Sequence, residues 1–230
     1  MPDDATKDST VDDDTPKSMS SRRLEAYSDG VFAIAATLLV LNLSVDSFHL
    51  KNPSSAQVWS ALGDSLPNLI SFVVSFLILG VLWGIHVRQF EFVQRVDQVV
   101  LTLNTFRLLG VVLVPFTTTL TDNFSDTVPG RFLLPLNFFY VVTIGLWQWW
   151  YASSPKRDLA PHLSDRYRRL SRRNALVAAI MSAIVAVASI WIGSYAFLLF
   201  LLNNVVDVAD RREAKKEPGR RTRAERRARD

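Results

Sequence analysis

The stretch Arg23–Val45, RLEAYSDGVFAIAATLLVLNLSV, decides the fold class of this chain. It opens with the polar pattern Arg-x-x-x-Tyr-Ser-Asp and continues as a run that is apolar nearly all round. The interior polar stripe of this run is small and consists of Gly30, Thr37 and Ser44. Because a helix of about 20 apolar residues crosses about 30 Å of hydrocarbon, we predict a membrane-spanning helix with a charged entrance.

The rest of the chain repeats this pattern. Of its 230 residues, 49% are hydrophobic, and they fall in runs of about 15 to 25 residues, the length of a membrane span. A soluble helical bundle would carry charged stripes along its helices, and these runs lack such stripes. The sequence contains no cysteine, which excludes disulfides and thiolate metal sites. We therefore predict an all-α, polytopic membrane protein.

We predict six transmembrane helices per chain. The first four are about Leu24–Val45, Leu66–His86, Val99–Thr119 and Phe132–Tyr151. The fifth and sixth share the run Ala175–Val206, which is too long for one straight crossing at about 1.5 Å per residue. We expect two short spans that turn at Ile192-Gly193-Ser194. A short outer helix is predicted over Ser54–Ser65, and a kink is predicted near Pro115.

Charged residues predict the orientation and the flanking segments. Basic residues gather before the first span, in the second–third and fourth–fifth connections and after Asp210, whereas the alternate connections hold only Lys51 and Arg131. The positive-inside rule then places both termini in the cytoplasm, with the chain in the plasma or inner membrane. We expect a disordered acidic tail over 1–20, a six-span domain over 21–209 and a basic tail over 210–230. This basic tail is either a plain solvated stop segment or a binding site for anionic headgroups.

One face of the first span has a heptad-like spacing. Gly30, Ile34, Thr37, Leu41 and Ser44 follow one another at intervals of four and three residues. Identical helices could pack around an axis along this face and form a pore. Such a pore would carry apolar rings at Ile34 and Leu41 and a hydroxyl ring at Thr37. Periodicity by itself favours an ordinary helix–helix seam without a lumen.

Several ionisable residues lie within or beside the predicted spans. Asp29 is too close to the apolar run to be freely solvated, and His86 lies at the same depth at the end of the second span. We expect His86 to bond Asp29 or Ser28. The alternative leaves His86 alone at the interface while Arg23 reaches the headgroups. Arg107 lies about 15 Å into the third span, where it needs a carboxylate from another span or a water-filled crevice.

Three stretches resemble the prokaryotic transmembrane protein 175 family. RLEAYSDGVFAIAATLLVLNL, residues 23–43, is similar to the first-span signature of that family, Arg-x-x-x-Phe-Ser-Asp followed by an apolar helix. LWGIHVRQF and LNTFRLLGVVLVPFTTTL resemble its Trp-x-x-His segment and its third span, and the similarity extends over residues 21–209. Tyr27 stands where the family has phenylalanine, and Arg107 stands where an apolar residue is usual.

The resemblance implies a potassium-selective, leak-type cation channel related to the endosomal and lysosomal potassium channel of animals. It implies a homotetramer in which the first helix lines a central pore with an apolar constriction and a threonine ring. By motif position, the predicted pore-lining residues are Ile34, Thr37, Leu38 and Leu41. The predicted inner polar network that holds the pore helix consists of Arg23, Ser28, Asp29, Trp83 and His86. We expect no cofactor and no metal beyond potassium ions passing near Thr37.

Two other functions remain open on the sequence alone. A proton-coupled secondary transporter would use Asp29, His86 and Arg107 as relay groups, but the chain lacks internal repeats and matching broken helices. A membrane scaffold would recruit partners through the basic tail without transporting ions. Enzyme chemistry and nucleic-acid binding are not expected, because the sequence contains no nucleophile–base or metal-ligand spacing and its basic tail adjoins a membrane.

Overall fold

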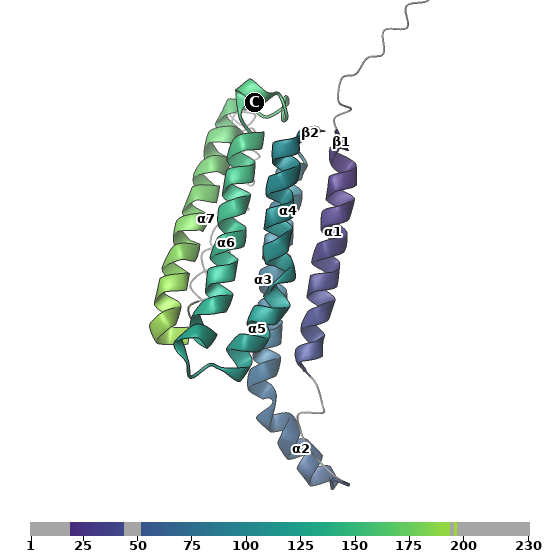
Figure 1. The fold of residues 1–230 in the computed structure, drawn as a ribbon, viewed down its shortest axis with the longest axis vertical. Helices are drawn as coiled ribbons and strands as arrows, with labels where there is room; N and C mark the ends of the chain where they lie inside the picture. Colours follow the sequence, from purple (N-terminus) through teal and green to yellow (C-terminus); the bar gives the residue numbers. More distant parts are fainter. Residues whose placement is uncertain (1–18, 44–51, 194–195, 197–230) are drawn as a thin grey trace, which may run out of the picture.

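The computed structural model describes residues 19–43, 52–193 and Ala196. These residues form a bundle of long helices that stand side by side, with one short helix extending from an end (Figure 1). The helices are α1 (Ser21–Leu38), η1 (Leu39–Asn42), α2 (Ser55–Asp64), α3 (Leu66–Phe90), α4 (Gln98–Val112), α5 (Val114–Asn123), α6 (Val128–Ala152), η3 (Pro155–Arg157) and α7 (Asp165–Ile192). Two short strands, β1 (Met19–Ser20) and β2 (Arg95–Val96), complete the described elements.

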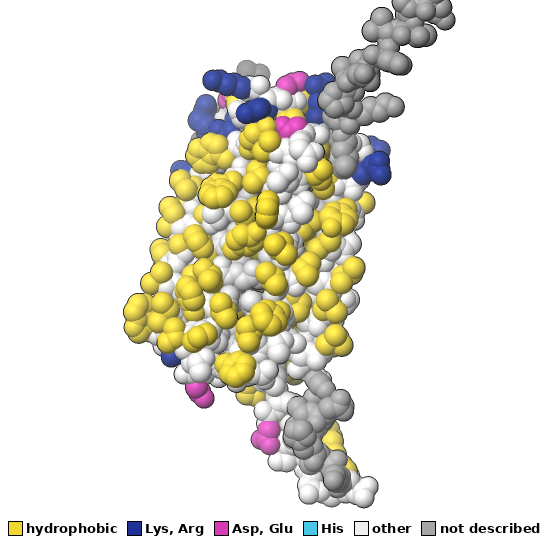
Figure 2. Space-filling view, viewed as in Figure 1, with side chains coloured by type: hydrophobic (Ala, Val, Ile, Leu, Met, Phe, Trp, Pro, Cys, Tyr) yellow, Lys and Arg dark blue, Asp and Glu magenta, His cyan; other side chains and the backbone are white. Residues whose placement is uncertain are grey.

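Within the described ranges, five helical segments are long and apolar enough to cross a membrane. They are Ser21–Asn42, Leu66–Phe90, Gln98–Asn123, Val128–Ala152 and Asp165–Ile192. The first four correspond to the first four predicted spans, and the fifth contains the first part of the shared run. The predicted sixth span lies outside the described residues, apart from Ala196. The visible face of the bundle carries hydrophobic side chains over its central part and gathers Lys and Arg at one end (Figure 2).

The helix of the fifth span, α7, begins earlier than predicted and ends where the turn was predicted. A short span beginning near Ala175 was expected, but α7 begins at Asp165 and has 28 residues. The basic segment before the apolar run is helical because the Ser164 hydroxyl caps it, accepting a hydrogen bond from the Tyr167 N–H at 3.3 Å. The helix ends at Ile192, because Gly193 takes φ 61° and ψ −148°, a conformation that essentially only glycine adopts.

The third span is broken where its proline lies. α4 ends at Val112 and α5 begins at Val114, so the kink predicted near Pro115 is confirmed. A threonine hydroxyl bonds a carbonyl at the break. The Thr117 hydroxyl donates to the carbonyl of Leu113 at 3.1 Å.

The predicted short helix is present as α2, at the end of the bundle away from the strands (Figure 1). A reciprocal capping box starts it. The Gln57 N–H donates to the Ser54 hydroxyl at 3.4 Å, and the Ser54 N–H donates to the Gln57 side-chain oxygen at 2.8 Å. Two of the first orphan backbone donors of the helix are thereby satisfied locally.

The strands connect the start of α1 to the turn between α3 and α4. β1 pairs antiparallel with β2, with Met19 opposite Val96 and Ser20 opposite Arg95. This corrects the boundary of the predicted acidic tail, since its last two residues belong to the folded part. The remaining tail residues, 1–18, and the basic tail, 210–230, lie outside the described residues.

The order of the helices places α1 and α7 on opposite flanks of the bundle (Figure 1). α6 lies in the interior and packs against α4, α5 and α7. α1 packs against α3 and α4. The main apolar core lies between these helices and includes Phe32, Leu79, Leu108, Val111 and Phe138. α1 is therefore fixed from one side only.

Candidate pore helix and buried polar network

One face of α1 and η1 is exposed on the single chain. Ile34 is 61% exposed, Leu38 40% and Leu41 68%. Gly30 and Thr37 are exposed on the same helix. All four residues predicted to line a pore are therefore accessible to another copy of the chain or to lipid.

The opposite face of α1 is buried. Leu24, Ser28, Phe32, Ala35 and Leu39 have exposed fractions of 4% or less. Their spacing of four, four, three and four residues forms one stripe along the helix. Since this stripe makes the contacts with α3 and α4, the exposed face of α1 is left for contacts outside the chain.

The hydroxyl of Thr37 is oriented by its own helix. It donates to the carbonyl of Ile34 at 2.8 Å. A hydroxyl has one hydrogen to donate and two lone pairs to offer. Because the hydrogen is used within the helix, the lone pairs of the Thr37 oxygen are left for a donor or a cation.

The far end of the same helix is tied to the broken span. After Leu38 the chain continues as the 3₁₀ turn η1. The side-chain oxygen of Asn42 accepts a hydrogen bond from the Thr119 hydroxyl at 2.6 Å. The Asn42 amide also donates to the Pro115 carbonyl at 3.5 Å. Asn42 was absent from the predicted site, although an asparagine within an apolar run is a signal for such a contact.

A row of buried polar side chains crosses the bundle behind α1. The Asn104 amide donates to the Ser28 hydroxyl at 3.0 Å, and the Ser28 hydroxyl donates to the Leu24 carbonyl at 2.8 Å. The Gln148 amide donates to the side-chain oxygen of Asn104 at 3.1 Å. The oxygen of Gln148 accepts from Arg107 Nη1 at 3.2 Å. This row connects α1 to α4 and α6.

Arg107 lies at the inner end of this row and is only 1% exposed. Its Nη1 donates to the Gln89 side-chain oxygen at 2.9 Å and lies 3.3 Å from His86 Nδ1. Of the two environments expected for Arg107, a carboxylate partner or a water-filled crevice, the carboxylate is not found among the described residues. Two amide oxygens and an imidazole surround the guanidinium instead. Asp97 is engaged elsewhere, accepting from the Tyr151 hydroxyl at 2.7 Å.

The guanidinium of Arg107 packs tightly against Gly145 of α6. A Cβ added to Gly145 would lie 3.0 Å from Arg107 Cζ and 3.1 Å from its Nε. Such distances are shorter than an ordinary van der Waals contact, so a larger side chain at this position would have to displace the guanidinium slightly. Neither Gly145 nor Gln148 was predicted from the sequence. Gln148 could have been noticed as an amide inside the aromatic segment LWQWW.

The five residues of the predicted inner network do not all meet. The Trp83 indole donates to Asp29 Oδ1 at 2.8 Å, which joins α3 to α1. His86 contacts Arg107 rather than Asp29 or Ser28, so the expected His86 bond is wrong. Ser28 belongs to the buried row described above. Arg23 is exposed.

The described residues thus define a polytopic α-helical membrane protein whose first span is held by one face through a buried polar network.

The family model described as "Endosomal/lysosomal potassium channel TMEM175" matches residues 23–115. A Streptomyces collinus protein named as a potassium channel is 44% identical over 98 residues, 43% of this chain and 46% of the relative. One from Chamaesiphon minutus is 38% identical over 107 residues, 46% and 52% of the two chains. The match spans about half the length of these curated relatives.

Solved structures agree. The crystal structure of a lysosomal potassium-selective channel TMEM175 homolog from Chamaesiphon minutus superposes with a TM-score of 0.56 at 27% identity, covering 80% of this chain and 98% of that chain. The crystal structure of a variant of the potassium channel MtTMEM175 gives a TM-score of 0.55 at 19% identity, over 85% and 94% of the two chains, which is a likeness of fold alone. Residues 23–115 therefore match the TMEM175 family, and the fold of most of the chain resembles that of solved TMEM175 channels.

Proposed function

We propose that this chain is one subunit of a homotetrameric, leak-type potassium channel whose pore is lined by α1. The observation that carries the proposal is the division of α1 into a buried face and an exposed face that bears Ile34, Thr37 and Leu41. Bacterial relatives of the N-terminal half are named as potassium channels, which supports the same function here.

The chemistry of the exposed face suits a cation pore of modest selectivity. Copies of Ile34, Leu38 and Leu41 around an axis would form a hydrophobic constriction, which can gate by dewetting. Copies of Thr37 would present hydroxyl oxygens whose hydrogens are already used within their own helices. Oxygens of this kind replace part of the hydration shell of potassium. One hydroxyl ring offers fewer ligands than four carbonyl loops, so we expect a modest preference over sodium.

A groove beside the exposed face supports contact between copies. It lies between α1 and α3, has a volume of about 390 Å³, and is open to the outside of the single chain. It is lined by Asp29, Phe32, Ala33, Ala36, Phe76, Leu79, Gly80 and Trp83. In a ring of subunits with the α1 helices at its centre, each subunit contacts its two neighbours through two different surfaces. One of these surfaces must receive side chains from the other. Small residues at the groove allow close approach of a helix.

The distribution of charge supports an orientation with both termini in the cytoplasm. Arg22 and Arg23 lie in the first turn of α1, directly after β1, and Arg88 lies in the last turn of α3, before β2. Lys and Arg gather at one end of the bundle (Figure 2). The positive-inside rule assigns such an end to the cytoplasmic side of a cell membrane.

The test is ion flux through the purified protein in proteoliposomes, with potassium and sodium compared. We expect potassium flux well above sodium flux, and Thr37→Ala is expected to lower this ratio. Thr105→Ala is a matched control, because the Thr105 hydroxyl also donates within its helix, to Leu101 at 3.0 Å, and is exposed. An unchanged ratio in Thr37→Ala would refute the threonine ring, and no cation flux from correctly assembled protein would refute the channel.

The apolar constriction is tested separately. Ile34→Asn should wet the constriction and raise the potassium current. The matched control is Ile180→Asn on α7, where the isoleucine is similarly exposed, at 52%. A current that rises equally in both variants, or in neither, would argue against Ile34 as a pore-lining residue.

The alternative function is a proton-coupled secondary transporter. It needs Asp29, His86 and Arg107 to form one relay, whereas Asp29 bonds Trp83 and His86 contacts Arg107. We therefore prefer the channel. Saturable flux driven by a counter-ion would favour the transporter, and a linear current–voltage relation would favour the channel. The flux assay includes a proton gradient, since vertebrate relatives are named as proton channels.

A further inference from the structure

We propose that three arginines on the outer face of α7 bind the headgroups of anionic phospholipids. They are Arg166, Arg169 and Arg173, and this group is called the arginine stripe below. All three side chains are exposed. With 3.6 residues per turn, spacings of three and four residues place them within about 60° of one another around the helix. They form one basic surface rather than three separate charges.

The arginine stripe continues directly into an apolar stripe on the same face. Ile180, Ile184, Val187 and Trp191 follow Arg173 at helical spacing, and Trp191 is 70% exposed. At about 1.5 Å per residue, Arg173 and Trp191 are about 27 Å apart along the helix, close to the thickness of the hydrocarbon layer. Arginine at one boundary and tryptophan at the other is the pattern of a helix face that contacts lipid.

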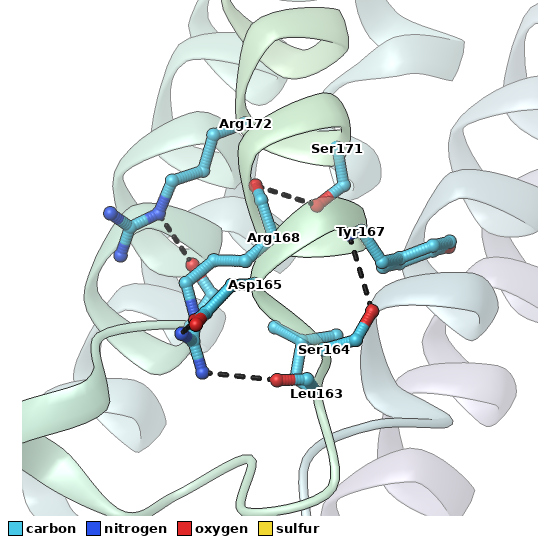
Figure 3. A network of polar contacts seen from close by, with 8 residues as sticks. Leu163, Ser164, Asp165, Tyr167, Arg168, Ser171 and Arg172 are labelled. Carbon is cyan, nitrogen blue, oxygen red and sulfur yellow. Dashed lines mark hydrogen bonds and ion pairs between the residues drawn. The ribbon is translucent and has the colours of Figure 1, made fainter.

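Two neighbouring arginines are occupied within the protein (Figure 3). Arg168 forms an ion pair with Asp165 and donates to the Leu163 carbonyl at 3.2 Å. Arg172 Nε donates to the Ser153 hydroxyl at 2.8 Å, and its Nη2 donates to the Trp150 carbonyl at 2.8 Å. The Arg172 contacts fix the basic end of α7 to the end of α6, and the Arg168 contacts fix the start of α7 itself. The helix that carries the arginine stripe is therefore held in place before any lipid binds.

The arginine stripe has no internal counter-charge among the described residues. Asp165 is the acid nearest in sequence, and its carboxylate is paired with Arg168. Guanidinium groups bind phosphate with two parallel hydrogen bonds, which favours phosphodiester headgroups over a neutral surface. Since the stripe adjoins an apolar face of bilayer length, we assign the phosphate to a lipid rather than to a free anion. α7 also lies on the flank opposite α1, so this role is independent of the proposed pore (Figure 1).

The test uses the full-length protein in detergent. Its melting temperature is measured as phosphatidylglycerol is added, and the affinity for the lipid is obtained from the rise. Arg166→Gln, Arg169→Gln and Arg173→Gln together should weaken binding by about 100-fold, from the usual contribution of each basic residue near an anionic surface. The matched control removes the same charge from exposed residues elsewhere at the basic end, with Arg22→Gln, Arg88→Gln and Lys156→Gln. The control should retain nearly all of the affinity.

Three results would overturn the proposal. One is an equal loss in both triple variants, which would indicate general electrostatic attraction. Another is an equal rise in melting temperature with inorganic phosphate, which would indicate a free-anion site. The third is unchanged binding in the stripe variant, as expected if residues outside the described ranges cover this face. If the triple variant does not fold, Arg169→Gln alone should weaken binding by about fivefold, and Arg169→Lys should keep most of it.

Discussion

Replacing Gln148 with leucine should destabilise the protein strongly, because this one side chain forms hydrogen bonds with two buried side chains. Its oxygen accepts from Arg107 Nη1 at 3.2 Å, and its amide donates to Asn104 at 3.1 Å. Leucine has a similar volume and can make neither bond. The substitution therefore removes hydrogen bonds while leaving the packing of α6 nearly unchanged.

The magnitude follows from the two bonds. A hydrogen bond to a charged group contributes about 1.5–3 kcal/mol, and the buried Asn104 oxygen left without a donor costs about 1–3 kcal/mol. We expect Gln148→Leu to lower the free energy of unfolding by about 3–5 kcal/mol. The assay is equilibrium unfolding in mixed micelles followed by circular dichroism. Gln94→Leu is the control, since Gln94 is an exposed residue outside the spans.

A double-mutant cycle tests the reasoning more sharply than the single variant. Arg107→Leu removes the buried cation together with its donors, so the later loss of Gln148 should cost less. The double variant should therefore be more stable than the sum of the two single effects predicts, by about 2 kcal/mol. Additive effects would refute the claim that Gln148 stabilises the protein by solvating the Arg107 guanidinium.

Two further substitutions probe the same helices. Gly145→Ala should lower the free energy of unfolding by about 1–3 kcal/mol, because the new Cβ would push against Arg107. Gly84→Ala on α3, whose Cβ would meet nothing within 4 Å, should be neutral or stabilising in the same unfolding assay. Equal effects at both positions would contradict the packing argument. Trp83→Phe should cost about 0.5–1.5 kcal/mol by removing the hydrogen bond to Asp29, and this cost should vanish in an Asp29→Ala background, which has no side-chain acceptor.

Hydropathy and local chemistry predicted most of the described fold. The spans follow from apolar runs of bilayer length, and the short outer helix follows from the capping residues Ser54 and Gln57. The break near Pro115 and the end of α7 at Gly193 depend on the backbone of a single residue, which makes them visible in the sequence. The start of α7 was placed ten residues too late, because an apolar run marks where a helix enters the membrane and not where it begins.

The buried row was harder to predict because it depends on which helix faces meet. Arg107 stood out in the sequence, but its partners come from α3 and α6 and lie up to 41 residues away. A carboxylate or a water-filled crevice was expected, because an ionisable group within a membrane span usually has one or the other. The side-chain oxygens of Gln89 and Gln148 stabilise the buried cation by accepting hydrogen bonds from it. Nothing in the sequence around either glutamine identifies it as a partner of Arg107.

The 3₁₀ turn at the end of α1 alters the register that a heptad pattern assumes. With three residues per turn, side chains three apart eclipse one another, so that Leu41 stands almost directly above Leu38. If these residues rewound into an α-helix, Leu41 would rotate by about 60° and move by about 1.5 Å along the axis. The direction of the Leu41 side chain is therefore set by the winding of this single turn, whereas the direction of Leu38 is set by α1.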